Sequence, residues 1–206
     1  MSRYTTSIPP SYFDERYAVD PDPWRFETSD YERAKYDATL GALPKPHYAS
    51  TFEVGCSIGV LTRQLAQCCD TLIALDVAEA ALDRARERCR ELNHVAFVCG
   101  QVPGDWPDGT FDLILLSEVI YYLDAGDVTR LARRVRDSLR PGGDVILVHW
   151  TGETHYPLTG DEAAEGFIAQ AAGFGTVTAR SRTDVYRLDV LTGHDPHKVC
   201  RTFAAP

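Results

Sequence analysis

A short turn beginning at Gly55 is flanked by two carboxylates. Residues 52–59 read FEVGCSIG and lead directly into a helical pattern, with Glu53 just before the turn. Asp76 ends the next predicted strand, 17 residues after Gly59. In a strand–turn–helix unit, glycines let the backbone approach a ligand closely, and an acid at the end of the next strand can bind two ribose hydroxyls. The spacing therefore predicts a site for a ligand that contains a ribose.

The glycine spacing differs from that of a dinucleotide-binding turn. The motif G-x-G-x-x-G, counted from Gly55, requires glycines where this chain has Ser57 and Val60. Close contact with a pyrophosphate is therefore less well provided for, and Glu53 would repel it but would attract a cationic ammonium group. No Arg or Lys directly follows Asp76, which argues against a 2′-phosphate. A phosphate-free cofactor fits better than NAD. For each acid one alternative to ligand binding stays open. Glu53 could be a solvated strand end, and Asp76 could cap the following helix.

Alternating strand and helix patterns must position these residues. Continuous apolar runs predict strands, and segments with apolar residues at helical spacing predict the helices between them. The predicted strands are residues 50–55, 71–77, 94–100, 111–118 and 144–150, and the predicted helices are residues 29–43, 59–69, 79–93, 124–140 and 161–172. Apolar strands that alternate with helices are typical of an α/β fold with a parallel sheet covered on both faces.

The C-terminal part of the chain predicts a different connection. Residues 178–193 and 197–205 are two strand candidates joined by a short Gly-His-Asp-Pro link. Such a short link suits an antiparallel hairpin and not a crossover between parallel strands. We therefore expect a Rossmann-like seven-stranded sheet that is mostly parallel, with the last strand inserted antiparallel. Residues 1–23 read as an irregular arm, so the expected division is an N-terminal arm and lid helix over residues 1–43 and a sheet domain over residues 44–206.

The composition narrows the classes of function. The chain has 206 residues, 44% hydrophobic and 25% charged, which is ordinary for a globular protein able to bury a core. No apolar run reaches the roughly 20 residues of a membrane span, and the N-terminus lacks the apolar segment of a secretory signal, so we expect a cytoplasmic protein. The formal charge of −9 argues against a nucleic-acid partner and suits a cationic small molecule. The cysteines are expected to be free thiols with no metal site, because none forms a C-x-x-C pair. They are Cys56, Cys68, Cys69, Cys89, Cys99 and Cys200.

The turn resembles the glycine motif of the class I S-adenosylmethionine-dependent methyltransferases. The family pattern is E/D-x-G-x-G-x-G, and this chain keeps Glu53, Gly55 and Gly59 but has Ser57 for the middle glycine. The resemblance implies the class I methyltransferase fold, S-adenosyl-L-methionine as the cofactor, and a ribose contact from Asp76. It also implies contacts from residues that follow the second, third and fourth strands. These are Val77 packed on the adenine, the Gln101 carbonyl oxygen and the Val102 backbone N–H at the adenine edge, and Ser117 after the fourth strand, while Gly55 and its neighbours lie along the methionine part.

Four segments resemble the nodulation protein S group more specifically. They are DPWRFETSDYER (22–33), FEVGCSIGVLT (52–62), FDLILLSEVIYYL (111–123) and RPGG (140–143). That group consists of N-methyltransferases acting on an amino sugar of a deacetylated chitin-type oligosaccharide. The resemblance implies this reaction, or methylation of a related small amine, by a monomer or homodimer. The alternatives are an O-methyltransferase acting on another small metabolite, an NAD-dependent oxidoreductase, and a cofactor-binding subunit without activity.

Polar residues after the fourth and fifth predicted strands are the candidates for methyl transfer to an amine. This displacement needs positioning, exclusion of water and a neutral amine. Glu118 could orient the amine, His149 could accept its proton near neutral pH, and Tyr121 could contact a sugar or the methyl group. In the alternatives, Glu118 caps a helix, His149 is an inner-face residue, and either Tyr121 or Tyr122 packs in the core.

The N-terminal region and the segment after the fifth strand supply further candidates. Trp24 and Arg25 could form a lid over the cofactor, or simply pack the arm on the core. Arg33 could bind the methionine carboxylate, or be a surface charge of its helix. His155, Tyr156 and Asp161 are expected to line the cleft for the methyl acceptor.

Overall fold

The computed structural model describes residues 3–196, which build one seven-stranded sheet. The strands are β1 (Tyr48–Val54), β2 (Cys69–Asp76), β3 (Val95–Cys99), β4 (Phe111–Ser117), β5 (Leu139–Trp150), β6 (Gly175–Arg182) and β7 (Tyr186–Gly193). Their order is β3-β2-β1-β4-β5-β7-β6, and β1 to β5 pair in parallel. β7 is antiparallel to both of its neighbours, β5 and β6. The predicted mostly parallel sheet with one reversed strand is therefore confirmed.

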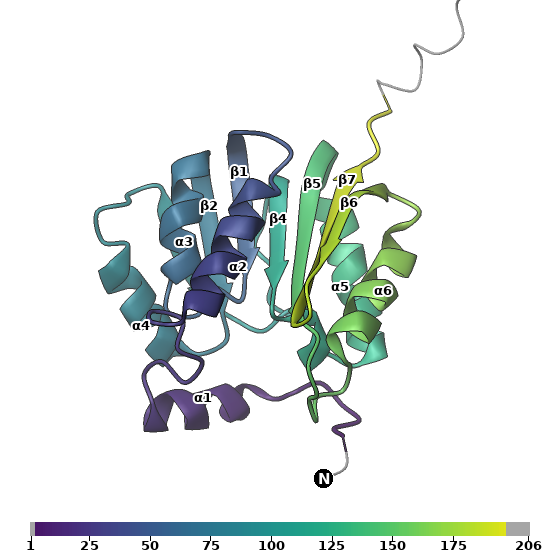
Figure 1. Ribbon diagram of the computed structural model, residues 1–206. Helices are drawn as coiled ribbons and strands as arrows, with labels where there is room; N and C mark the ends of the chain where they lie inside the picture. Colours follow the sequence, from purple (N-terminus) through teal and green to yellow (C-terminus); the bar gives the residue numbers. More distant parts are fainter. Residues whose placement is uncertain (1–2, 197–206) are drawn as a thin grey trace, which may run out of the picture.

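Helices cover both faces of the sheet. They are α1 (Pro10–Val19), α2 (Asp30–Gly41), α3 (Val60–Leu65), α4 (Glu79–Arg88), α5 (Ala125–Ser138) and α6 (Gly160–Ala171), with short 3-10 helices η1 (Ala66–Cys68) and η2 (Ile120–Tyr122). α2 and α3 share a core with one face of β4 and β5, whereas α5 and α6 share a core with the other face. Figure 1 shows α1 lying across the lower edge of the sheet, below the carboxyl ends of the parallel strands.

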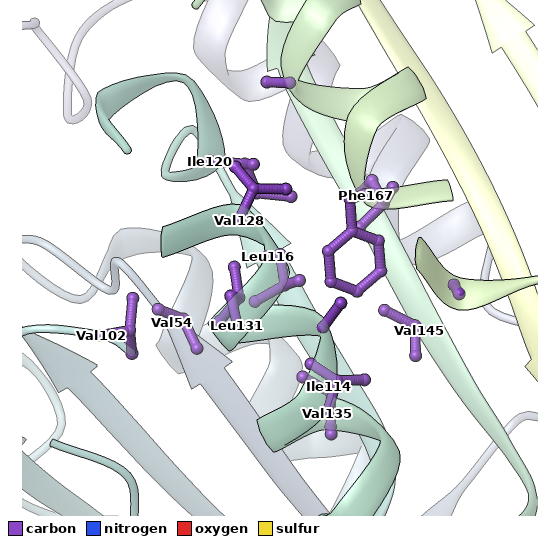
Figure 2. Close-up of a cluster of buried hydrophobic side chains, with 14 of the residues drawn as sticks. Val54, Val102, Ile114, Leu116, Ile120, Val128, Leu131, Val135, Val145 and Phe167 are labelled. Atoms are coloured by element: carbon purple, nitrogen blue, oxygen red, sulfur yellow. The ribbon is translucent and has the colours of Figure 1, made fainter. Parts of the chain in front are cut away.

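The larger core lies between the sheet and the helices α5 and α6. Its strand residues include Ile114 and Leu116, which alternate with residues facing the other side, and Phe167 of α6 is fully buried against them. Figure 2 shows these side chains together with Val128, Leu131 and Val135 of α5. The turns after β1, β2, β4 and β5 lie at one edge of the sheet, because these strands are parallel and end at the same edge.

The N-terminal arm differs from its sequence prediction. Residues 1–23 were expected to be irregular, yet Pro10–Val19 form helix α1, with Pro10 at its first turn. Only Tyr17 of this helix is buried, so the segment lacks the apolar stripe of an amphipathic helix. The helix is stabilised by contacts to the turn after β1 and to α4, which the local sequence does not encode.

The C-terminal hairpin is also placed differently from the prediction. The single strand expected over residues 178–193 is divided into β6 and β7, and the turn lies at residues 183–185. The Thr183 hydroxyl accepts hydrogen bonds from the backbone N–H groups of Val185 and Tyr186, which stabilises this turn. The predicted strand over residues 197–205 lies outside the described residues.

Three elements have boundaries that differ from the prediction by several residues. The helix expected over residues 79–93 ends at Arg88, and the helix expected over residues 59–69 is shorter and continues as η1. β5 begins at Leu139, so the PGG segment expected to precede this strand lies within it.

The described part of the chain also answers three questions, on cysteines, membrane segments and metal sites. Cys56, Cys69 and Cys89 are buried free thiols, Cys68 is partly buried and Cys99 is exposed, while Cys200 lies outside this part. No helix among residues 3–196 combines the length and apolar character needed to cross a bilayer. Within the same range, no three His, Cys, Asp or Glu side chains are grouped in a way that could hold a metal ion.

Candidate active site

A cavity of about 390 Å³ opens at the carboxyl ends of β1, β2 and β4, and α1 covers it with Phe13 and Tyr17. This volume falls in the range of small-molecule sites. Its wall combines aromatic rings with a few polar groups, and it brings together most of the residues singled out in the sequence. From that set it contains Trp24, Gly55, Ser57, Asp76, Val77, Gln101, Val102, Ser117, Glu118, Tyr121, Tyr122 and Tyr156.

The turn after β1 depends on glycine at two positions. Gly55 has φ of 81°, and a Cβ there would lie 2.4 Å from Val119 Cγ2 and 3.1 Å from the Ser117 carbonyl oxygen. Gly59 has φ of 77°, and a Cβ there would lie 2.9 Å from the Ala85 Cα atom. The first glycine therefore lets the turn pass close to the end of β4, and the second lets α3 begin against α4.

Ser57 takes a conformation that usually favours glycine. Its φ is 48°, in the left-handed region, which explains why a glycine is expected at this position of the motif. The serine hydroxyl is hydrogen-bonded to the Tyr17 hydroxyl, and Tyr17 belongs to α1. The departure from the motif thus provides a direct link between the turn and the helix that covers the cavity.

The Asp76 carboxylate is held by two backbone groups at the end of β2. Oδ2 accepts a hydrogen bond of 2.8 Å from the Ser57 N–H, and Oδ1 accepts one of 3.0 Å from the Ala78 N–H. Burial raises the pKa of Asp76, and these two N–H donors partly offset that effect. A carboxylate has about four acceptor sites, so two remain for a ligand. Asp76 therefore combines hydrogen bonds to the turn after β1 and to the residue before α4 with a position in the cavity wall.

The residues after β3 form the neighbouring part of the wall. Val102 is 5% exposed and lines the cavity together with Val77, which gives an apolar surface suited to a planar base. The Gln101 side-chain nitrogen donates a 3.0 Å hydrogen bond to the Ile8 carbonyl oxygen. This bond orients the amide and ties the N-terminal arm to the end of β3.

Glu53 does not line the main cavity but a narrow side cavity of about 30 Å³ next to it. The two cavities share Gly55, Ser57 and Glu118, among other residues. Glu53 is 2% exposed, so it is not a solvated strand end. Burial raises its pKa to about 7, the Thr62 hydroxyl partly offsets this rise, and nearby Asp76 adds to it. A cation entering the side cavity would therefore be stabilised by this carboxylate.

Glu118 is the most fully bonded carboxylate of the main cavity. Oε1 lies 2.6 Å from the Lys35 ammonium, while Oε2 accepts a 2.7 Å bond from the Tyr121 hydroxyl and a 2.9 Å bond from the Trp150 N–H. Its φ of 56° lies in the left-handed region, where a non-glycine residue costs about 1–3 kcal/mol. The strained residue is therefore one whose side chain is contacted from α2, from the segment after β4 and from β5.

Lys35 and Glu32 are site residues that the sequence analysis missed. Both belong to α2, which the Ser29 hydroxyl caps by accepting from the Glu32 N–H at 3.3 Å. Glu32, Lys35, Tyr36 and Thr39 are all buried, with the i, i+3, i+4, i+7 spacing of one helix face. That spacing includes the aromatic residue Tyr36, so it was a signal that Glu32 and Lys35 face inward.

His149 does not occupy the position expected of a proton acceptor. It is fully buried and is not part of the cavity wall, and its Nε2 accepts a 3.2 Å hydrogen bond from the Ile120 N–H. Burial lowers its pKa to about 4, although Glu118 opposes this shift. The structure thus places His149 off the cavity wall, which is the position that its alternative as an inner-face residue describes. The reason is the alternation of side chains along β5, which turns His149 away from the cavity that Trp150 lines.

Tyrosine side chains surround Glu118 on the side away from the turn. Tyr121 and Tyr156 are stacked with ring centroids 5.4 Å apart, and Tyr122 contacts both of them edge-on. Trp24 stacks on Phe26 at 5.8 Å and lines the opposite wall. Aromatic faces attract cations, so this wall and Glu118 together favour an ammonium group.

Several charged candidates lie outside the cavity. Arg33 is exposed and pairs with Asp30 at 3.0 Å, so its alternative as a surface charge of the helix describes its position. Arg25 is exposed and pairs with Asp20 at 3.1 Å. Asp161 is bonded to Arg187 at 3.0 Å and to Arg182, and His155 is exposed. The local sequence predicts whether these residues lie in a helix or a loop, but it does not predict the direction of their side chains.

Comparison with known proteins places this arrangement among methyltransferases. The family model described as Nodulation protein S (NodS) matches residues 13–150. The chain is 32% identical over 185 residues to the nodulation protein S of Bradyrhizobium diazoefficiens, covering 87% of this chain and 83% of that protein. It is 36% identical over 130 residues to the nodulation protein S of Rhizobium tropici, covering 61% of this chain. The matched segment spans only 54% of that relative's own length.

A solved structure shares the whole fold. It is the N-methyltransferase NodS of Bradyrhizobium japonicum WM9 in complex with S-adenosyl-L-homocysteine, with a TM-score of 0.74 and 22% identity. The superposition covers 90% of this chain and 99% of that one. At this identity the likeness establishes the class of fold.

Proposed function

This chain belongs to the nodulation protein S family, and from that premise we propose that it is an S-adenosylmethionine-dependent N-methyltransferase acting on a small amine. The observation that carries the proposal is the position of Glu118. Its carboxylate lies in an aromatic wall of the same cavity that contains the glycine turn and Asp76. An amine acceptor and a ribose-containing cofactor therefore have neighbouring binding groups within one cavity.

The residues present fit S-adenosylmethionine. Gly55 lets the turn lie in the cavity wall, because a Cβ there would meet Val119 and the Ser117 carbonyl oxygen. Asp76 retains free acceptor sites for ribose hydroxyls, and Val77 and Val102 give an apolar wall for the adenine. Glu53 supplies a buried carboxylate for a cationic ammonium group in the adjoining side cavity. This set favours a cofactor with a ribose and an amino-acid part over one with a pyrophosphate.

When bound, S-adenosylmethionine supplies a methyl group on a cationic sulfur, which an amine lone pair takes by in-line displacement while the carbon–sulfur electron pair returns to sulfur. The chain's contribution is to position the amine and to exclude water. Glu118 attracts the amine and stabilises the positive charge that develops on its nitrogen. Tyr121 orients Glu118 through its 2.7 Å hydrogen bond, and the surrounding aromatic rings keep the site dry.

An amino sugar fits the cavity better than a phosphorylated amine. Lys35 is the only basic side chain among the described residues that line the main cavity, and two carboxylates already share its charge. A phosphate would therefore find no available cationic partner in this wall. Aromatic side chains such as Tyr122 and Tyr156 offer flat surfaces for a sugar ring. The acceptor we propose is the amine of a deacetylated chitin-type oligosaccharide or a similar uncharged carrier.

Binding and turnover measurements test the proposal. Calorimetry with S-adenosylmethionine and, separately, with NAD should give binding of the first only. Incubation with deacetylated chitooligosaccharides and S-adenosylmethionine should add the mass of one methyl group to the sugar amine. Turnover only with hydroxyl or carboxylate acceptors would replace the proposal by an O-methyltransferase, and cofactor binding without turnover would indicate a binding subunit.

A matched pair of variants tests the role of Glu118. Glu118→Gln removes the negative charge but keeps the side-chain volume, so cofactor affinity should be retained while turnover falls roughly 10-fold or more. Glu162→Gln, in the exposed capping box of α6, is the control and should leave both quantities unchanged. Equal turnover in Glu118→Gln and in the wild-type protein would contradict the proposed role.

A further inference from the structure

Lys35 is a buried cation whose charge is shared by two carboxylates. Its side chain is 3% exposed, and Nζ lies 2.6 Å from Glu118 Oε1 and 3.0 Å from Glu32 Oε2. The centroid of the Tyr31 ring lies 5.0 Å from the same nitrogen, which adds a cation–π contact. Burial of an ammonium is compensated only by partners of this kind.

Lys35 completes the set of contacts that orients Glu118. The other oxygen of this carboxylate is bonded to the Tyr121 hydroxyl and the Trp150 N–H, so both oxygens have a partner. The three partners come from α2, from the segment after β4 and from β5, which are far apart in the sequence. Loss of the α2 partner would free one oxygen to rotate or to take up a proton.

We propose that Lys35 is a positioning residue, which holds Glu118 as an oriented anion so that the carboxylate can bind the acceptor amine. This inference rests on the proposed N-methyltransferase function, because the amine is the ligand that Glu118 is expected to contact. Lys35 acts through Glu118 and does not itself bind the acceptor, since its charge is shared by Glu32 and Glu118.

The balance of burial and charge at Glu118 supports this assignment. Burial alone raises the pKa of Glu118, but Lys35 and, to a smaller extent, His149 lower it below its ordinary value. Burial also lowers the pKa of Lys35, but Glu118 and Glu32 reverse this effect and raise it. The titratable groups that face Glu118 are Tyr31, Glu32, Lys35 and Tyr36 from α2, Tyr121 and Tyr122 after β4, and His149 from β5. Lys35 is the nearest cation among them, so Glu118 depends on it to remain ionised while buried.

Glu32 sets the net charge of this group. Glu32, Lys35 and Glu118 together carry one net negative charge when all three are ionised, which matches one ammonium group. Burial raises the pKa of Glu32, and Lys35 opposes that rise. Neutralising Glu32 would therefore weaken the attraction for a cationic amine without removing a contact to Glu118.

The test compares Lys35→Met with Lys35→Arg in the full chain. Loss of the cation in Lys35→Met should raise the pKa of Glu118 by roughly 1–3 units, since that is the usual effect of one neighbouring opposite charge. The acidic limb of the kcat/KM profile for the sugar amine, where protonation of Glu118 adds to protonation of the amine itself, should move to higher pH. Lys35→Arg keeps the charge and should restore most of the wild-type profile.

A spectroscopic measurement makes the test independent of activity. The carboxyl carbon resonance of Glu118, identified by its absence in Glu118→Gln, is followed against pH by NMR in the wild-type protein and in Lys35→Met. A titration of Glu118 that is the same in both proteins would overturn the proposal. A titration near neutral pH in the wild-type protein would also overturn it, because Glu118 would not then be held as an anion.

A control variant separates positioning from stability. Lys45→Met removes a lysine that lies 3.0 Å from the buried carboxylate of Asp144, outside the cavity wall. It should lower the melting temperature without moving the pH profile. A Lys35→Met variant that only lowers the melting temperature, as this control does, would show that Lys35 has a purely structural role.

A second variant covers the case in which Lys35→Met does not fold. Glu32→Gln should raise KM for the amine severalfold and move the acidic limb to lower pH, because the full charge of Lys35 then acts on Glu118. Movement of this limb to higher pH would refute the proposal. Absence of turnover in the wild-type protein would contradict the proposed function instead, and the NMR titration would still decide the role of Lys35.

Discussion

Replacement of Asp76 by alanine separates the two roles that the structure gives this carboxylate. Asp76 accepts backbone hydrogen bonds from Ser57 at 2.8 Å and from Ala78 at 3.0 Å, and it lines the main cavity. Asp76→Ala should therefore lower both the free energy of unfolding and the affinity for S-adenosylmethionine, by amounts that can be measured independently.

The magnitudes follow from the partners that remain after the substitution. Ala78 is fully buried, so its N–H would lose its acceptor without gaining water, which costs about 1–3 kcal/mol. The Ser57 N–H lies in the cavity wall and would lose less. We expect a loss of roughly 2–4 kcal/mol in the free energy of unfolding. Loss of charge-assisted bonds to ribose hydroxyls should weaken cofactor binding by roughly 1.5–3 kcal/mol, or about 10- to 150-fold in Kd.

Urea denaturation without ligand gives the stability effect, and calorimetry at a temperature well below the transition gives the affinity. Glu79→Ala is the control, because Glu79 lies close to Asp76 in the sequence, in the first turn of α4, and its side chain is 56% exposed. It should change both quantities by less than about 0.5 kcal/mol. A lower stability of Asp76→Ala with an unchanged Kd would reject the ribose contact and leave only the two backbone hydrogen bonds.

Three further substitutions test the turn and the buried titratable groups. Gly59→Ala should lower the free energy of unfolding by about 2 kcal/mol or more in urea, because the new Cβ meets the Ala85 backbone at 2.9 Å and φ is positive; an unchanged midpoint would contradict this. Burial lowers the pKa of His149 to about 4 from 6.5, so the unfolded chain binds more protons and stability is lost as the pH falls through this interval. His149→Gln should therefore remove roughly 2 kcal/mol of acid destabilisation between pH 7 and pH 5. Burial raises the pKa of Glu53 to about 7 from 4.5, so the folded chain binds more protons than the unfolded chain between these two pH values. The resulting stabilisation of the folded protein is complete below pH 4.5 and is lost as the pH rises through 7. Glu53→Gln should remove roughly 2 kcal/mol of the stabilisation that the wild-type protein gains between pH 7 and pH 5. If the free energy of unfolding depends on pH equally in the wild-type protein and in one of these two variants, the pKa assigned to that residue is refuted.

The sequence by itself determined the class of fold and the cofactor side of the site. Apolar runs alternating with helical patterns encode a parallel sheet, because burial on both faces requires that pattern. The spacing from Gly55 to Asp76 places the turn and the acid at one edge, because parallel strands end there. Gly55, Ser57, Asp76, Val77 and Val102 do line one cavity, as expected from these short-range constraints.

Only the tertiary structure decided which distant side chains meet. Lys35 contacts Glu118 across 83 positions of the chain, and the periodicity of α2 shows at most that Lys35 faces inward. His149 was expected to face the acceptor, but it is fully buried off the cavity wall, where its Nε2 accepts a hydrogen bond from the Ile120 N–H. Arg33 was expected at the cofactor, but it lies exposed on α2 beside Asp30. Helix α1 lacks a strong local pattern and forms because Tyr17 docks on Ser57.

The physical reason for this division is the range of the interactions. Helix periodicity, strand alternation and turn chemistry depend on residues a few positions apart, so they can be read along the chain. The charge of a buried carboxylate and the partner of a buried lysine depend on desolvation and on groups within about 4–6 Å in space. Packing of α2 against the carboxyl ends of β4 and β5 sets those distances, and it thereby decided the environment of Glu118.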